Sequence, residues 1–316
     1  MSSAILFDRD RVDHLEPLSA RPGRLRGSKL LWVDISERTG AHADEVAEAF
    51  DLDRQTRERL ARSPGRAVFE DFGRYIHMTT YSPCEGGEEL MALECVVGEN
   101  WVITAHDRPV AVLQEFAERV SGSGNTGVLD GPAFVATLLE WVLGAYTEAF
   151  DRLEQELEEF DVEAMRGEGR NPEAEIERLI TMRQEVGVLR RALAAHPSAL
   201  LALTHPELEA LGSKRSGERF QSLLTRYEST VQEARDARES IVGSFEVLIA
   251  RTGHRTNEIM KVLTLTSVIF LPGALLAGLM GMNFKVGLFG ASWAFYFVLA
   301  AVLAIAPLTL AIDQGP

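Results

Sequence analysis

The feature that most constrains this chain is a C-terminal segment almost without charge. Between residues 262 and 312, a stretch of 51 residues, the only charged side chain is Lys285. Two apolar runs lie within it, residues 262–280 with 19 residues and residues 293–312 with 20. Each run is long enough to cross a hydrocarbon layer of about 30 Å as a helix, and buried core helices seldom run this long without a charge. We therefore expect two transmembrane helices.

All of the net charge belongs to the rest of the chain. The sequence has 32 Lys and Arg against 47 Asp and Glu, a formal charge of −15. Because Lys285 offsets Asp313, the whole excess falls on residues 1–261. Nucleic-acid binding needs clustered Lys and Arg that displace counterions from phosphates, so this composition excludes it and favours a cation as the partner.

The sequence predicts neither an enzyme nor a bound cofactor. The seven His residues have no HxxxH or HExxH spacing, so no preformed zinc site is expected. No GxSxG or Walker A sequence is present either. Two Cys residues without a CxxC spacing, and a start that lacks a signal peptide, favour a body that stays in the reducing cytoplasm.

Apolar periodicity divides the chain into four parts. Residues 1–130 hold strand-like runs at 29–35, 74–81, 90–98 and 100–106, with helical patterns between the first two, which predicts an α/β domain. Residues 131–215 predict an acidic helical hairpin, turning at 167–172, and a connector. Residues 216–261 continue as a stalk helix into the two-span membrane domain, residues 262–316.

The stalk pattern indicates an oligomer. If residues 217–280 form one helix, their 64 residues span roughly 95 Å at about 1.5 Å per residue. A monomeric domain cannot bury a rod of that length, so we expect the helix to pack against copies of itself.

Flanking charge predicts the orientation in the membrane. Arg251, His254, Arg255 and Lys261 precede the first span, whereas the loop between the spans has Lys285 alone. Basic residues concentrate on the cytoplasmic side. We therefore expect a multi-pass protein of the plasma or inner membrane, in contact with its lipid, with both termini in the cytoplasm.

One face of the first span continues into the stalk at helical spacing, counted back from Met282. It is small or hydroxylated within the span and polar before it. Two interpretations stay open: close packing between membrane helices, which favours small residues, or a pore built by symmetry-related copies, with Leu271, Leu263 and Met260 as apolar constrictions. The face comprises Gly278, Ala274, Leu271, Ser267, Thr264, Met260, Asn257, Gly253, Ala250 and Glu246.

The tripeptide Gly281-Met282-Asn283 follows the first span at its expected outer end. A ring of Asn amide oxygens could accept hydrogen bonds from a hydrated cation. Mg²⁺ suits such a ring because it gives up its water reluctantly. Asn283 could instead cap the helix, since Asn readily adopts the left-handed conformation.

With this motif the sequence resembles the CorA family of divalent-cation transporters. The run of residues 256–284, TNEIMKVLTLTSVIFLPGALLAGLMGMNF, is similar to that family's pore helix, and WVDI (32–35), FEDFGRYI (69–76) and NWVITAH (100–106) resemble landmarks of its cytoplasmic domain. The resemblance implies a homopentamer with an α/β/α cytoplasmic funnel, a stalk helix continuous with the first span, and two transmembrane helices.

The resemblance also implies roles for particular residues. Gly281, Met282 and Asn283 would form the outer selectivity filter, and Asn283 would be a metal-binding residue. Glu246 would sit near the cytoplasmic mouth of the pore, and Glu246 and Asp236 are candidate acids of a regulatory metal site. The pore lining would comprise Asn257, Met260, Leu263, Thr264, Leu271, Ala274 and Gly278.

The predicted function is transport of divalent cations, foremost Mg²⁺ and also Co²⁺ or Ni²⁺, driven by the membrane potential and gated by intracellular divalent cation. The outer loop holds Lys285 and no acid, which resembles the zinc-associated ZntB branch, so zinc transport, with or without proton coupling, is the alternative. A membrane-anchored scaffold or sensor is the rival outside transport.

Overall fold

The computed structural model divides the chain into two units, Met1–Ser244 and Phe245–Pro316, and each is treated by itself. Helix α7 (Lys214–Gly281) contributes to both. The residues that the structure describes are 3–8, 11–15, 29–36, 38, 40–62, 68–84, 89–122, 130–166, 172–196, 200, 203, 214–281, 293, 296, 297, 299, 300, 302–304 and 307.

The first unit contains a seven-stranded mixed sheet with strand order β2-β1-β3-β7-β6-β5-β4. The four predicted strand runs are confirmed as β3 (Leu30–Ser36), β5 (Ile76–Pro83), β6 (Leu90–Val97) and β7 (Trp101–His106). Strands β1 (Ser3–Asp8), β2 (Arg11–Leu15) and β4 (Phe69–Asp71) were not among the predicted runs. Only β3 and β7 pair in parallel; the other described neighbours are antiparallel.

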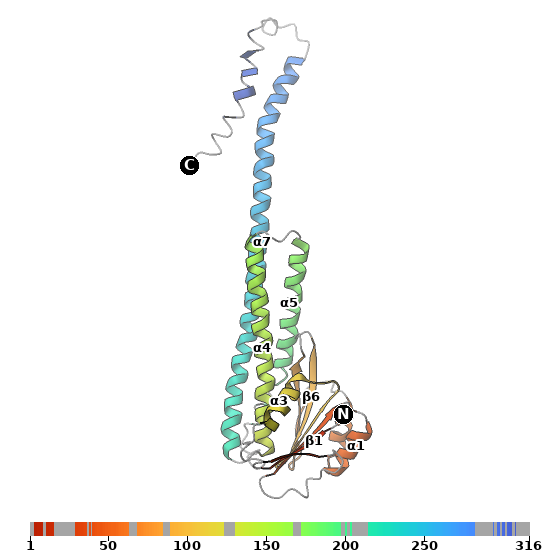
Figure 1. Cartoon of the computed structure of the whole chain (residues 1–316). Coiled ribbons are helices and arrows are strands. Elements are labelled where there is room, and N and C mark those ends of the chain that lie inside the picture. The colour runs from red at the N-terminus through yellow and green to blue at the C-terminus, as the bar shows by residue number, and fades with distance from the viewer. Residues whose placement is uncertain are drawn as a thin grey trace. The chain divides into compact units, whose positions relative to one another are not determined.

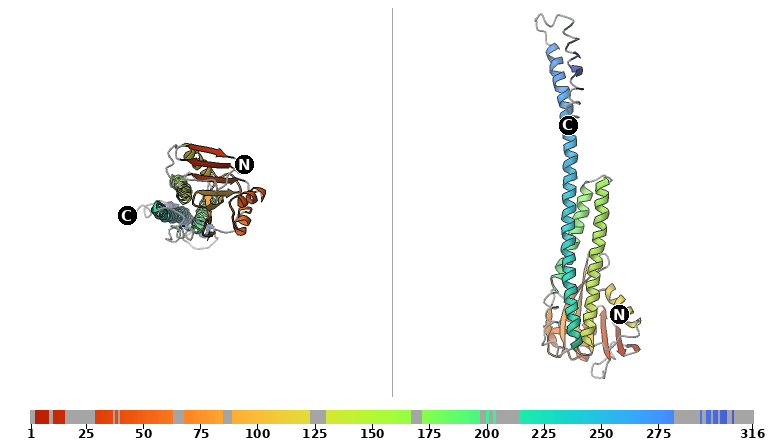
Figure 2. Two further views of the ribbon diagram at one scale, coloured as in Figure 1. Left: turned by 90° about the horizontal axis from the view of Figure 1, so that it is seen from below. Right: turned by 90° about the vertical axis from the view of Figure 1, so that its left-hand side faces the viewer.

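Helices cover both faces of the sheet, as the view from below in Figure 2 shows. Helices α1 (Gly40–Ala49) and α2 (Arg54–Leu60) lie on one face. Helices α3 (Ala111–Gly122), α4 (Gly131–Arg166) and α5 (Pro172–Leu193) lie on the other. The predicted α/β/α domain with a long helix is therefore confirmed, although α3 was not foreseen.

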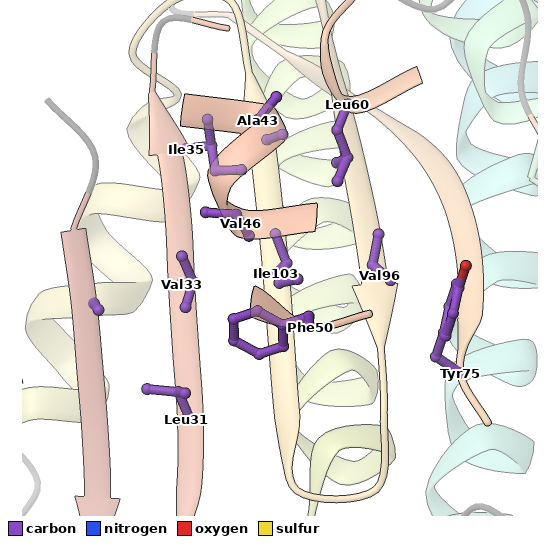
Figure 3. Close-up of a cluster of buried hydrophobic side chains, with 12 residues drawn as sticks. Leu31, Val33, Ile35, Ala43, Val46, Phe50, Leu60, Tyr75, Val96 and Ile103 are labelled. Atoms are coloured by element: carbon purple, nitrogen blue, oxygen red, sulfur yellow. The ribbon is translucent and has the colours of Figure 1, made fainter. Parts of the chain in front are cut away.

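The core between the sheet and α1 follows from alternation along the strands (Figure 3). Leu31, Val33 and Ile35 point to this face from β3, and Ile103 joins them from β7. Phe50, at the end of α1, covers them. Each side chain is at most 5% exposed, so each contributes about 1.5–3 kcal/mol of apolar burial.

The opposite face holds an aromatic cluster. The ring of Trp32 on β3 packs edge-on against Phe116 of α3, with ring centroids 5.8 Å apart, and against Phe134 of α4 at 5.3 Å. Phe116 and Phe134 also contact each other at 5.1 Å. This cluster is what holds α3 and the first turns of α4 on the sheet.

A close backbone approach sets where α4 begins. The Gly131 amide donates to the Glu99 carbonyl at 2.7 Å, and a Cβ at Gly131 would lie 2.0 Å from the carbonyl oxygen of Gly98. Only glycine fits there. Asp130 accepts a hydrogen bond from the Ala133 amide at 2.8 Å and so caps the helix.

Helix α4, helix α5 and the first part of α7 run side by side in this unit (Figure 1). Thr147 of α4 donates to Glu233 of α7 at 3.0 Å, Tyr227 of α7 donates to the Leu193 carbonyl at 3.0 Å, and Ser244 donates to Asp161 at 2.9 Å. The acidic stretch of α4 keeps its apolar side, with Leu153, Leu157 and Phe160, buried.

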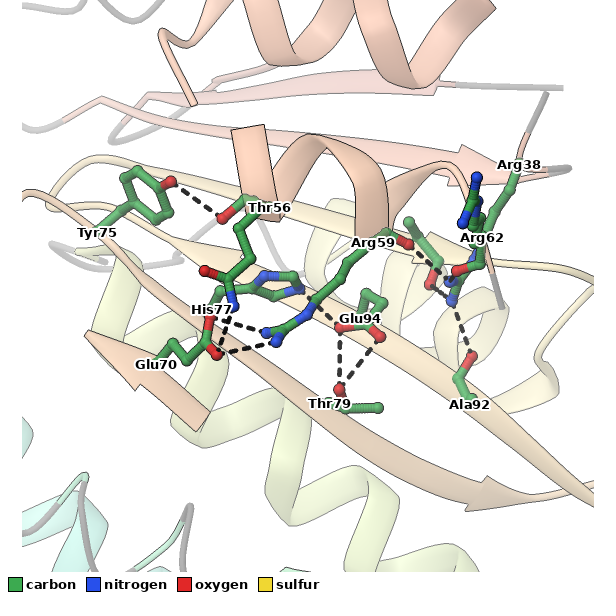
Figure 4. Close-up of polar contacts among 12 residues, drawn as sticks. Arg38, Thr56, Arg59, Arg62, Glu70, Tyr75, His77, Thr79, Ala92 and Glu94 are labelled. Carbon is green, nitrogen blue, oxygen red and sulfur yellow. Dashed lines mark hydrogen bonds and ion pairs between the residues drawn. The ribbon is translucent and has the colours of Figure 1, made fainter. Parts of the chain in front are cut away.

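Buried polar groups tie the α1/α2 layer to the sheet (Figure 4). The Arg38 guanidinium donates to the Arg62 carbonyl at 2.6 Å and to the Ala105 carbonyl of β7 at 2.9 Å. Burial lowers the pKa of Arg38, while Asp107 and Glu94 oppose that shift. Glu94 itself accepts hydrogen bonds from Thr79 at 3.0 and 3.1 Å.

A second polar chain joins β3 to β7 on the α3 side. Trp32 Nε1 donates to Thr104 Oγ1 at 3.0 Å, and Thr104 donates to Asp34 Oδ1 at 2.5 Å. His106 Nε2 lies 3.2 Å from Asp34 Oδ2, and its Nδ1 lies 2.6 Å from the carbonyl oxygen of Arg108. Both ring nitrogens face oxygens that can only accept, so the imidazolium form fits this geometry.

The titration of His106 should therefore contribute to stability. Burial lowers the pKa of His106, but the hydrogen bond and charge of Asp34 and the Arg108 carbonyl outweigh it, so the pKa is raised. A raised pKa contributes stability that is fully present below the unfolded-state value of about 6.5 and is lost as pH rises through the folded-state value.

We predict that His106→Gln destabilises the protein more at pH 6 than at pH 8.5. Below the unfolded-state pKa the variant lacks a charge-assisted hydrogen bond, which typically contributes about 1.5–3 kcal/mol. Thermal unfolding of the full chain in detergent, followed from pH 5.5 to 9, measures this. His14→Gln, an exposed position on β2, is the control. If the loss of stability caused by His106→Gln did not change with pH, the assignment of a charged His106 ring would be contradicted.

Candidate functional site

The second unit contains the part of α7 from Phe245 to Gly281, and this helix is apolar and exposed. Its most apolar 18-residue window is 0% buried, whereas the comparable window of α4 is 61% buried. Phe270 and Leu271, adjacent in sequence, are 71% and 72% exposed. An apolar helix with this much exposed surface needs lipid or further protein around it, so α4 is a core helix and α7 is the candidate membrane span.

One side of α7 is half-buried within the unit, namely Leu265, Ile269, Pro272, Gly273 and Leu276. A Cβ at Gly273 would meet Val302 Cγ1 of the second apolar run at 3.5 Å. Trp293, Tyr296 and the other described residues of that run are helical, and the rest of it lies outside the described residues. The second run therefore packs on this side of α7.

The predicted pore-lining residues lie on the other side of the helix. At about 100° per residue, the face that runs from Glu246 to Gly278 is roughly opposite the half-buried side. Every residue assigned to the pore is exposed: Asn257, Met260 (53%), Leu263 (59%), Thr264, Leu271 (72%), Ala274 and Gly278. Among the described residues, the small residues of this face are thus not used in packing against the second run.

The glycines of α7 also differ between the two sides of the helix. A Cβ at Gly253 or Gly278 would meet nothing within 4 Å, in contrast to Gly273. Nothing among the described residues of this chain therefore requires a small side chain at Gly253 or Gly278.

Pro272 lies inside α7. It cannot donate the backbone hydrogen bond that would reach the Val268 carbonyl one turn earlier. Membrane helices tolerate this where other groups or water satisfy the carbonyl. The hydroxyls of Thr266 and Ser267 instead bond to their own helix, at Val262 and Leu263 (2.8 and 2.9 Å).

The predicted selectivity filter lies at the end of what the structure describes. Gly281 is the last residue of α7 and is exposed. Met282, Asn283 and Lys285 lie outside the described residues. The filter assignment of Gly281, Met282 and Asn283 therefore stays a prediction.

The candidate regulatory acids are both exposed on α7. Asp236, in the first unit, accepts a hydrogen bond from Gln232 at 2.8 Å. Glu246 belongs to the second unit. No group of three or more His, Cys, Asp or Glu side chains that could hold a metal occurs among the described residues. A metal site at either acid would need further ligands from outside the described residues of this chain, for example from another copy.

Sequence reasoning missed the chain of polar groups through Asp34 and His106. These two residues are 72 positions apart and meet only because β3 and β7 pair in parallel, with Ser36 opposite His106. No spacing rule could have joined them. The nearest signal was that each falls in, or next to, a strand-like run.

Known proteins resemble this chain in sequence and in fold. A cobalt/magnesium transport protein CorA from Thermotoga maritima is 24% identical over 269 residues, covering 80% of this chain and 73% of the relative. The complete CorA magnesium transporter of Methanocaldococcus jannaschii superposes with a TM-score of 0.79 at 18% identity, over 99% of this chain and 98% of that chain.

The cytoplasmic domain of ZntB from Vibrio parahaemolyticus also shares the fold. Its TM-score is 0.60 at 10% identity, over 80% of this chain and 98% of that domain. The CorA-like Mg2+ transporter protein family model matches residues 27–312, and the chain therefore belongs to this family of membrane transporters.

Proposed function

We propose that this chain transports divalent cations, with Mg²⁺ as its principal ion and Co²⁺ and Ni²⁺ as further substrates, through a homopentamer. The observation that carries the proposal is the direction of the small and polar face of α7. That face is exposed and points away from the second apolar run, so it is available to line a path between copies. A scaffold anchored by a two-span hairpin would not need such a face.

Within this proposal, the ion is recognised with its water attached. Asn283 presents a neutral amide oxygen to the hydrated cation, which fits the reluctance of Mg²⁺ to dehydrate. Below it, Leu271, Leu263 and Met260 form apolar constrictions that close by losing water. The body and both termini are cytoplasmic, because Arg251, Arg255 and Lys261 precede the first span.

The membrane potential supplies the energy. A divalent ion that enters a compartment 100 mV negative gains about 4.6 kcal/mol, twice the value of about 2.3 kcal/mol for one elementary charge. Val262 to Met280 contains no Asp, Glu or His side chain that could carry protons. Transport therefore requires no proton coupling.

Zinc transport is the second candidate. The outer loop carries Lys285 and no carboxylate to concentrate cations, and the body has the fold of a ZntB domain. The GMN tripeptide with Met282 favours Mg²⁺ instead.

A liposome flux assay tests the function. The purified chain should carry Mg²⁺, Co²⁺ and Ni²⁺ down an imposed potential, at rates that do not depend on a pH gradient. Asn283→Ala should reduce Mg²⁺ flux at least about tenfold while the pentamer persists in native mass spectrometry. Flux of Zn²⁺ alone, dependent on the pH gradient, would establish the second candidate, and unchanged Mg²⁺ flux in the variant would refute the filter.

The constriction can be tested with two exposed aliphatic residues of α7. Leu271 is 72% exposed and lies on the proposed pore face, whereas Val262 is 64% exposed and lies on the side of Leu265 and Ile269, away from that face. Leu271→Ala should widen the constriction and raise Mg²⁺ leak severalfold when internal Mg²⁺ is high. Val262→Ala should leave flux near the wild-type level. Equal effects of the two changes would contradict the pore face.

We also propose that intracellular Mg²⁺ closes the pore by binding between acidic faces of neighbouring copies, with Glu246 and Asp236 among its ligands. Bound cation screens the repulsion between bodies that carry a formal charge of −15 each.

Glu246→Gln and Asp236→Asn should therefore each raise, severalfold, the internal Mg²⁺ concentration that halves the flux. Glu258→Gln removes another exposed acid, from the side of α7 away from the pore face, and is the control. The same Mg²⁺ dependence in all three variants would exclude both acids from regulation. Protease sensitivity that is the same with and without Mg²⁺ would contradict metal-induced closure.

A further inference from the structure

A pocket of about 310 Å³ lies in the first unit, between the sheet and α3. Its apolar lining includes Ile5 of β1, Trp32 of β3 and Leu113 of α3. Asp34 and His106 supply polar groups at one part of the lining. The pocket lies at the carboxyl ends of β3 and β7, the parallel pair of the sheet, and small molecules commonly bind at such ends of α/β sheets.

The hydrogen bonds at Asp34 all run toward its carboxylate, which accepts them. Trp32 donates to Thr104, and Thr104 donates to one carboxylate oxygen of Asp34. His106 directs Nε2 to the other oxygen. A carboxylate can accept about four hydrogen bonds, and the Asp34 side chain keeps 17% of its surface exposed. The pocket therefore offers an acceptor, and its occupant has to bring a donor.

Charge argues for an uncharged occupant. The carboxylate of Asp34 is already paired with the His106 ring, which carries the positive charge in this geometry. Arg108, also in the lining, pairs with Glu89 at 3.0 Å. A free cation would meet a neutralised carboxylate beside a buried imidazolium, and an anion would face the Asp34 oxygens.

We propose that this pocket binds a small, uncharged, largely apolar molecule with a hydroxyl group, an alcohol or a phenol. The hydroxyl donates to the Asp34 carboxylate, and the apolar body lies against Trp32, Ile5 and Leu113. Such a molecule would bridge β1, β3 and α3 of the body. This site does not depend on the transport proposal, because every residue in it belongs to the first unit.

Fluorine NMR of the full chain in detergent, labelled with 5-fluorotryptophan, tests the site. The chain has four Trp residues, and Trp→Phe changes assign their signals. Benzyl alcohol should shift the Trp32 signal saturably. Trp101, which packs against Phe50 on the other face of the sheet, should not move. Trp293, in the second apolar run, reports any partition of the probe into the micelle.

Two matched probes examine the donor and the charge. Benzyl methyl ether has a similar body and no donor, so it should bind at least about tenfold more weakly, the usual effect of one hydrogen bond to a charged group. Benzylammonium should bind more weakly than benzyl alcohol. Equal binding of the ether would overturn the role of Asp34, and tighter binding of the ammonium ion would overturn the choice of an uncharged ligand.

A matched pair of variants tests whether the probe binds in this pocket. Ala117 of α3 lines the pocket, and Ala117→Leu should fill it and abolish the saturable Trp32 shift. Glu118→Leu adds the same side chain at the next position, which is exposed and outside the lining, and should preserve the shift. No Trp32 shift in the wild-type protein, or a shift that persists in Ala117→Leu, would refute the site.

Discussion

A helix that crosses lipid has to satisfy its own backbone hydrogen bonds, because the hydrocarbon offers none. Helix α7 meets that constraint over its apolar part except at Pro272, where the Val268 carbonyl loses its helical donor, and it still keeps a face of small and polar residues. That face is exposed and lies opposite the side that packs on the second apolar run. Apolar surface and a polar path are therefore divided between different sides of one helix, and the proposed transport depends on this division.

The first unit holds the N-terminal part of helix α7. Thr147, Tyr227 and Ser244 make the hydrogen bonds that join the first part of α7 to α4 and α5. Helix α4 in turn begins where Gly131 meets Gly98 at the sheet, a contact that admits no side chain. The exposed acids of these helices are thus carried on helices that hydrogen bonds join to one another, which suits a proposed response to bound cation.

Helix α7 and the central strands could be predicted from the sequence, whereas other elements could not. Helical periodicity that meets no Pro before Pro272 predicted a helix at residues 217–280, and α7 runs over Lys214–Gly281. Runs of β-branched and other apolar residues predicted the four central strands. A strand buried on both faces has few polar positions, so its sequence is a nearly continuous apolar run. β1 and α3 escaped notice. Their apolar residues, such as Phe7 and Phe116, become buried only through partners far away in the chain.

The sequence by itself determined which segments are apolar enough for a membrane, which residues share a face of α7 and where the negative charge lies, because these follow from local composition and helical period. Tertiary structure alone decided that the face of α7 points away from the second run, and that Asp34 meets His106 beside a pocket. Both outcomes depend on contacts between residues far apart in the chain, and no local spacing encodes such contacts.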